Sequence, residues 1–220
     1  GIFTIDLDFR ENINIKSNNK NNNETIELNT DISEITELNF NINNIDNNKI
    51  KIKRKYKLED IINLCEKITN ILQNYIEYDT EIDNHIFDYY IFERPNPRLD
   101  KDKIKDGVHI IYPNINITYN LYHYVRQELL ENNLYNIFSK CKYSNSNEDI
   151  FDDAVIERNN WLMYGSTKPD IPAYTLTYSN TENEKDQKLI KLLKKIFRKK
   201  QKQNDEENEN KNDEENENKN

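Results

Sequence analysis

The sequence predicts an α+β fold, and three observations carry the prediction. Residues 3–9 alternate apolar and polar side chains over the length of one strand. Residues 58–76 place apolar side chains every three or four positions, the spacing of one helical face. Runs rich in β-branched and aromatic residues at 87–93 and 106–113 predict two more strands, with a basic loop between them. Strands and helices mixed in this way predict a sheet with helices packed against it.

The first strand carries two acidic residues at alternate positions. Asp6 and Asp8 share one face and Ile5, Leu7 and Phe9 the other, because residues two apart on a strand point the same way. Two neighbouring carboxylates repel unless a cation lies between them, and Mg²⁺ binds carboxylate and phosphate oxygens. Taken alone, this alternation is more typical of a strand with a polar, solvent-exposed face. The motifs further along the chain favour the metal site.

Composition predicts a domain with polar appendages. Hydrophobic residues make up 35% of the 220 and charged residues 32%, which is too polar for a wholly globular chain. The formal charge of −9 is unevenly placed, since residues 203–220 consist mainly of Asn, Glu and Asp and repeat one eight-residue unit. We expect this tail to be disordered. The net charge therefore does not exclude binding to nucleic acid.

Several classes of protein are excluded or disfavoured. Cys65 and Cys141 are too few for a zinc site or a disulfide framework, which suits a reducing, intracellular compartment. No apolar run approaches the ~20 residues of a spanning helix, and no secretory signal is visible. The G-x-x-x-x-G-K-[ST] pattern is absent, so no P-loop motor is expected. The chain begins with Gly1 almost directly on a strand, which suggests a fragment or a start close to the domain edge.

Two basic segments stand out, one inside the predicted domain and one after it. An Asn-rich insertion at 12–53 runs into a cluster at 51–55, which is either a solvated charge run or a contact with a phosphate backbone. Residues 184–202 predict a basic amphipathic helix, which is suited to lie on a partner, to lie on nucleic acid or to pack on the core. The expected organisation is a domain at 1–180, this helix and the acidic tail.

A second polar motif lies in the strand at 106–113. Its single histidine, His109, follows Gly107, where a turn is expected. A lone strand histidine is usually structural, but Lys105 lies four residues earlier, so the two side chains together suit an anion. Residues 119–138 then predict a second helix.

A third motif follows that helix. Phe151 and Asp152 belong to an acidic stretch at a strand or turn. Further on, residues 165–167 (Gly-Ser-Thr) suit a turn with exposed backbone N–H groups, and Lys168 adds a charge, so phosphate would be cradled there. Residues 174–178 predict a closing strand.

The order of the three motifs resembles that of the archaeo-eukaryotic primase superfamily. Asp-Leu-Asp at 6–8, Gly-Val-His at 107–109 and Phe-Asp at 151–152 match its paired acids, its small residue-x-His and its hydrophobic-Asp. The strings Lys-Asp-Gly-Val-His-Ile-Ile-Tyr-Pro at 105–113 and Asn-Asn-Trp-Leu-Met-Tyr-Gly-Ser-Thr-Lys at 159–168 are similar to the N-terminal primase domain of viral primase-helicases. Those proteins come from poxviruses, asfarviruses and giant DNA viruses. The resemblance covers roughly Phe3 to Tyr178 and implies an RRM-like palm sheet with flanking helices.

The resemblance also implies a set of site residues. Asp6, Asp8 and Asp152 correspond to the catalytic, metal-binding acids. Asp152 is preferred to Asp153 because the family's acid lies three residues before the valine that Val155 matches. The residues placed near the nucleotide's phosphates are Lys105, His109, Ser166 and Lys168.

One departure concerns nucleotide binding. The related proteins often carry an arginine directly after the aromatic residue, where this chain has Leu162 after Trp161. Arg158 is a candidate substitute.

The implied activity is template-directed primer synthesis on single-stranded DNA in viral replication. Two Mg²⁺ or Mn²⁺ ions would activate the attacking hydroxyl and stabilise the leaving pyrophosphate. The implied partners are the template, nucleoside triphosphates and a replicative helicase in cis or in trans, with no membrane, at replication sites in the host cytoplasm. Two alternatives stay open, a catalytically degenerate module that binds nucleic acid or a replisome partner, and a metal-dependent nuclease. In the favoured reading, the first strand lies inside the sheet and its acidic face looks into a cleft with His109 and Lys168.

Overall fold

The computed structural model describes most of the chain between the first strand and the C-terminal helix. The described residues are 1–12, 52–101, 103–132, 134–157, 171–182, 184–193 and 195–196. Most of the Asn-rich insertion, the Gly-Ser-Thr-Lys loop and the acidic tail lie outside them.

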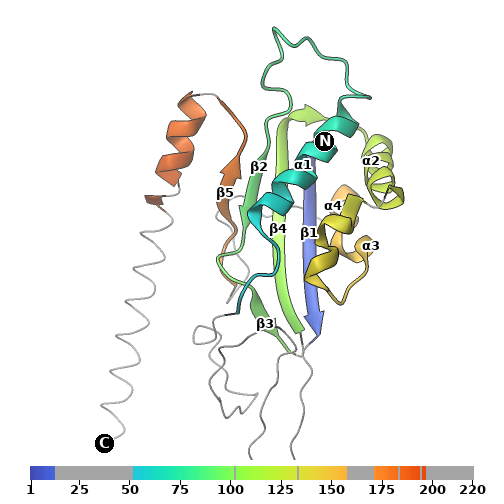
Figure 1. Ribbon diagram of the computed structural model, residues 1–220. Coiled ribbons are helices and arrows are strands. Elements are labelled where there is room, and N and C mark those ends of the chain that lie inside the picture. The colour runs from blue at the N-terminus through green and yellow to red at the C-terminus, as the bar shows by residue number, and fades with distance from the viewer. Residues whose placement is uncertain are drawn as a thin grey trace, which may run out of the picture.

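An antiparallel sheet forms the centre of the described structure (Figure 1). Its strands run in the order β1, β4, β2, β5, and β3 pairs with β4 as well. All the pairings between these strands are antiparallel. The strand bounds are β1 Ile2–Asn12, β2 Tyr90–Glu93, β3 Arg98–Asp100, β4 Lys103–Asn116 and β5 Thr175–Ser179.

Helices flank this sheet, which confirms the predicted α+β class (Figure 1). Helix α1 lies across β1 and β4, and the short helices α3 and α4 lie beside β1. A further described helix covers residues 184–193 after β5. The bounds of the others are α1 Leu58–Leu72, α2 Tyr119–Glu131, α3 Asn147–Ile150, α4 Ala154–Glu157 and the 3₁₀ segment η2 Leu134–Cys141.

A hydrogen bond and two acidic residues stabilise the first turn of helix α1. The backbone N–H of Lys57 donates to Oδ2 of Asp60 at 2.8 Å, which caps an otherwise unpaired donor. Two acidic residues in the first turn suit the positive end of the helix dipole. The helix ends at Leu72, four residues before the end that the apolar pattern predicts. Residues that recur on its inner face are buried: Ile61, Leu64, Cys65, Ile68, Ile71 and Leu72.

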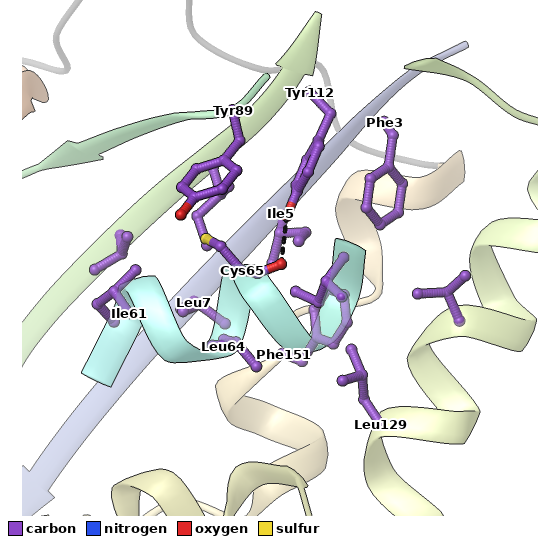
Figure 2. Close-up of a cluster of buried hydrophobic side chains, with 14 of the residues drawn as sticks. Phe3, Ile5, Leu7, Ile61, Leu64, Cys65, Tyr89, Tyr112, Leu129 and Phe151 are labelled. Carbon is purple, nitrogen blue, oxygen red and sulfur yellow. Dashed lines mark hydrogen bonds between the residues drawn. The ribbon is translucent and has the colours of Figure 1, made fainter. Parts of the chain in front are cut away.

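The core lies between α1 and one face of the sheet (Figure 2). The apolar half of the β1 alternation, Phe3, Ile5, Leu7 and Phe9, is at most 1% exposed. Tyr112 of β4 is also fully buried, and its hydroxyl donates to the backbone carbonyl of Cys65 at 2.9 Å. The period-two pattern therefore assigns one face of β1 to the core and leaves the other face open.

The prediction that β1 lies inside the sheet is wrong. Among the described strands it is the first of the order, whereas β4 and β2 each have neighbours on both sides. The outer edge of β1 is covered by a non-strand segment instead. Asn145 donates to the carbonyl of Asp8 at 2.7 Å and accepts from the N–H of Arg10 at 3.0 Å. An isolated bridge joins Leu7 to Phe151. These contacts give hydrogen-bond partners to backbone groups on the β1 edge, which a bare edge strand would leave exposed.

Two further local predictions need correction. Gly107 lies in the middle of β4 rather than in a turn. The second helix ends at Glu131, and the residues up to Cys141 form a 3₁₀ segment instead. None of the helices in the described ranges is long and apolar enough to cross a membrane.

The basic cluster before α1 is partly used in structural ion pairs. Arg54 forms two hydrogen bonds with Asp106, at 2.7 and 3.0 Å, and one with Glu93 at 2.9 Å. Burial works to lower the pKa of Arg54, but the hydrogen bonds and charges of the two carboxylates raise it overall. Lys55 pairs with Glu11 at 2.6 Å. Arg54 therefore ties the ends of β2 and β4 together on the core face.

Candidate active site

The open face of the sheet brings the first two sequence motifs together. In the register of β1 against β4, Asp6 stands opposite His109, Asp8 opposite Gly107 and Arg10 opposite Lys105. Directly opposite residues of an antiparallel pair point to the same face. All of these positions are therefore on the face that α1 does not cover.

Asp6 and His109 are close enough to interact directly. Nε2 of His109 lies 3.4 Å from Oδ1 of Asp6. Burial lowers the pKa of His109 to about 3, and the positive charge of Arg94 acts in the same direction. The imidazole is therefore neutral at pH 7, and it can donate one hydrogen bond and accept one.

Asp8 is held by a cation from its own strand. Nε and Nη2 of Arg10 donate to Oδ2 of Asp8 at 3.0 and 2.7 Å. The pKa of Arg10 is raised by that hydrogen bond and by the charge of Asp8, with smaller contributions from Asp149 and Asp152. Arg10 is thus a counter-charge for the acidic residues at this edge of the sheet.

Asp152 lies beside Asp6, on the segment that covers the β1 edge. The bridge between Leu7 and the fully buried Phe151 places Phe151 on the core side of this edge, and Asp152 follows directly. The backbone N–H of Asp152 donates to the carbonyl of Asp6 at 3.1 Å. Its Oδ1 accepts from the N–H of Ala154 at 2.9 Å. Across the sheet, Asp152, Asp6 and His109 therefore occupy neighbouring positions.

The remaining predicted residues are not gathered at this point. Lys105 faces the same side as His109, but four strand residues separate them by about 13 Å. Its Nζ pairs with Asp100 at 2.8 Å. Ser166 and Lys168 lie outside the described residues, as do Arg158 and Trp161.

Two residues that the sequence did not indicate complete the surroundings of His109. The ring of Tyr174 stacks on the imidazole with centroids 3.7 Å apart and an angle of 22°. The guanidinium carbon of Arg94 lies 4.2 Å from the centre of the Tyr174 ring. Burial raises the pKa of Tyr174, and the charges of Asp6 and Asp8 add to the effect. The alternation around 174–178 indicated a strand but gave no sign of this contact.

Gly107 has a steric role beneath the Tyr174 ring. A Cβ built on Gly107 would lie 2.5 Å from the Tyr174 hydroxyl and 3.3 Å from the carbonyl of Leu7. Real Cβ atoms essentially never approach within 3.0 Å of another heavy atom. The glycine therefore makes room for the tyrosine two residues before His109.

The chemistry of the acidic residues fits a hard divalent cation. Asp6 and Asp8 on the open face, and Asp152 beside the β1 edge, have carboxylate oxygens, the donors that Mg²⁺ and Mn²⁺ prefer. In the described part of the chain, no three His, Cys, Asp or Glu side chains are grouped so that they could hold an ion. Asp8 is turned toward Arg10 and Asp152 toward its own turn. Joint ligation therefore needs these two side chains to rotate.

Comparisons with known proteins point to the same motifs. A family model described as the N-terminal AEP domain of the C962R protein, where AEP denotes archaeo-eukaryotic primase, matches residues 1–179. A protein described as "Putative helicase L207/L206" from Acanthamoeba polyphaga mimivirus is 32% identical over 117 residues. That match covers 53% of this chain and 12% of the length of the mimivirus protein.

Proposed function

Because the chain belongs to the family of C962R-type archaeo-eukaryotic primase domains, we propose that it synthesises primers on a single-stranded DNA template. The observation that carries the proposal is the placement of Asp152 and His109 on either side of Asp6, in segments that pair with β1. Nucleotidyl transfer requires positioning and charge neutralisation more than covalent chemistry by the protein. Carboxylates beside a neutral hydrogen-bonding group supply both.

In this proposal the acidic residues hold the metal ions. Asp6, Asp8 and Asp152 would ligate Mg²⁺ or Mn²⁺, with phosphate oxygens and water as further ligands. Such ions, when bound, favour the attack of a hydroxyl on the α-phosphate and the departure of pyrophosphate. Arg10 would give up Asp8 if the ion took Oδ2, the carboxylate oxygen that accepts both of its hydrogen bonds.

His109 contributes to nucleotide binding. As a neutral imidazole it donates a hydrogen bond to a phosphate oxygen without an added charge that would repel the metal ions. Lys105, Ser166 and Lys168 are assigned to the triphosphate by motif alone. Lys105 would have to exchange its partner Asp100 for phosphate.

A binding module without catalysis is the second candidate. It is favoured by the pairing of Asp8 with Arg10, which neutralises one of the acidic residues. A third candidate, the metal-dependent nuclease, uses similar acidic residues but gives no role to His109.

The name of the mimivirus relative supports a proposal about partners. Since that protein is described as a putative helicase, we propose that this domain works with a replicative helicase, in the same polypeptide or in another. Viral replication sites in the host cytoplasm are the proposed location.

One assay separates the three candidates. The full chain is incubated with Mn²⁺ or Mg²⁺, a single-stranded DNA template and labelled nucleotides. Primer synthesis predicts new products that are lost in Asp6→Ala, Asp8→Ala and Asp152→Ala and kept in Asp88→Ala, a carboxylate that pairs with His85. Template binding without product by the wild-type chain would contradict the proposal and favour the binding module. Shortened template would identify the nuclease.

A further inference from the structure

Tyr174 occupies a position on the open face that packing of the core does not explain. It precedes β5, whereas its ring lies over β4, stacked 3.7 Å from the His109 ring. The core is on the opposite face, where Tyr178 of β5 lies near Tyr89 with centroids 6.1 Å apart. The rings of Tyr174 and Tyr178 thus lie on opposite faces of the sheet.

Three independent contacts hold the Tyr174 ring in place. His109 stacks on the ring, and the Arg94 guanidinium also lies over it, at 4.2 Å from its centre. Groups at these distances cannot share one face of a ring, so the ring lies between them. The hydroxyl reaches over Gly107, where any Cβ would collide with it. Arg94 is itself anchored, since Nη1 donates to the carbonyl of Pro172 at 3.2 Å.

The stack restricts the imidazole that faces Asp6. A side chain with one ring face covered cannot turn about its χ2 bond without breaking that contact, and the covered face is also closed to water. Asp6 then meets the imidazole at Nε2, 3.4 Å away. The direction of the histidine's hydrogen-bonding groups is thereby fixed before any ligand arrives.

We propose that Tyr174 is the positioning residue for His109: its ring, held between the imidazole and Arg94, sets the direction in which His109 meets the phosphates of a bound nucleoside triphosphate. This inference rests on the proposed function of the same face. Tyr174 does not touch the reacting atoms in this account. Its effect is on nucleotide affinity, because a preorganised group loses less freedom on binding.

The experiment compares three variants of the full chain. Tyr174→Phe keeps the ring and removes the hydroxyl, and Tyr174→Leu removes the ring. Tyr178→Leu is the matched control, since it removes a tyrosine ring four residues further along the same segment, but from the core face. Each is titrated with ATP and with dATP in the presence of Mg²⁺. The KM for nucleotide and the KM for template are measured in the primer assay.

A second readout needs neither ligand nor activity. In histidine-labelled protein, the ring-proton resonances of His109 should be shifted upfield by the Tyr174 ring that stacks on it. The chain has three histidines, and His109→Gln identifies the relevant signal. The upfield shift should persist in Tyr174→Phe and Tyr178→Leu and disappear in Tyr174→Leu.

The expected result is a selective loss of nucleotide binding. Tyr174→Leu should weaken triphosphate binding about tenfold and raise the nucleotide KM by a similar factor, with the template KM unchanged. Tyr174→Phe and Tyr178→Leu should stay within about twofold of the wild type.

Other outcomes would overturn the inference. Unchanged nucleotide affinity in Tyr174→Leu, with the upfield shift lost, would show that the stack does not serve binding. An equal loss in Tyr178→Leu would show general damage to the sheet. A wild-type chain that binds no triphosphate would refute the proposed function, and this inference with it, before any variant is compared.

Discussion

Asp6 and His109 stand at matching positions of two neighbouring antiparallel strands, with Oδ1 of Asp6 3.4 Å from Nε2 of His109. The aspartate is on the strand at the sheet edge, and the histidine is on the central strand. Asp6 and His109 therefore meet through backbone pairing of β1 with β4, which holds the two side chains in register.

Burial of His109 predicts a loss of stability at mildly acidic pH. Its pKa is about 3 in the folded chain against an ordinary value of 6.5, so between these values only the unfolded state takes up the proton. Stability from this group is fully present above pH 6.5 and falls as the pH decreases. At pH 5 the loss should be about 2 kcal/mol. Denaturant unfolding at pH 7.5 and pH 5 measures it.

Two variants isolate that contribution. His109→Gln should lose about 2 kcal/mol less than the wild type between the two pH values. His123→Gln should behave as the wild type, because the His123 side chain is 46% exposed. Parallel losses in the wild type and in His109→Gln would show that the histidine is not the source.

Gly107 and Tyr174 should be energetically coupled. In Gly107→Ala, the new Cβ would lie 2.5 Å from the tyrosine hydroxyl and must displace it, which should weaken nucleotide binding. In the Tyr174→Phe background the nearest ring carbon is 3.5 Å away, an ordinary contact. The tight 3.3 Å contact with the Leu7 carbonyl is common to both backgrounds, so the alanine should be tolerated better there than in the wild type, with a coupling energy of about 0.5–3 kcal/mol. Triphosphate titration of both single variants and the double variant measures it, and additive effects would contradict the steric account.

Arg54 should be important for stability rather than for nucleic-acid binding. Arg54→Leu leaves Asp106 and Glu93 buried without their cation, and removal of one partner from such a cluster costs about 3–5 kcal/mol. Lys53→Leu, an exposed neighbour, should change stability by less than about 0.5 kcal/mol. Denaturant unfolding compares the two. A stable Arg54→Leu variant with weakened DNA binding would instead favour a phosphate contact.

Arg10 should compete with divalent cations for Asp8. Arg10→Gln removes the guanidinium that is 2.7 Å from that carboxylate. Mn²⁺ affinity should rise by about two- to fivefold, the scale of a partly exposed ion pair. Arg98→Gln is the control, since Arg98 pairs with Asp100. Weaker Mn²⁺ binding in Arg10→Gln would show that the arginine supports the site instead.

Local periodicity predicted the elements on which the site is built. The alternation along β1 placed Asp6 and Asp8 on one face of the strand and Ile5 and Leu7 on the other. The structure confirms this division, since Ile5 and Leu7 are buried. The apolar spacing of α1 likewise predicted which of its residues are buried. Both patterns are set by residues close together in the chain, so they can be read from the sequence.

The parts that depend on distant residues could not be predicted. The edge position of β1 follows from strand order, which no local pattern encodes. Gly107 indicated a turn by its residue type, whereas its actual role is to admit a ring from Tyr174, sixty-seven positions later. Arg94 joins that stack from the position directly after β2. These contacts exist only once the sheet has formed.

The central claim is that Asp6, Asp8 and Asp152 jointly bind the divalent cation on the open face. Titration with Mn²⁺ in the presence of nucleoside triphosphate, followed by electron paramagnetic resonance, tests it most directly. Asp6→Asn, Asp8→Asn and Asp152→Asn should each weaken protein-dependent Mn²⁺ binding at least about tenfold, since each removes a charged oxygen ligand. Asp88→Asn should bind as the wild type does. Wild-type affinity in all three site variants would contradict the account.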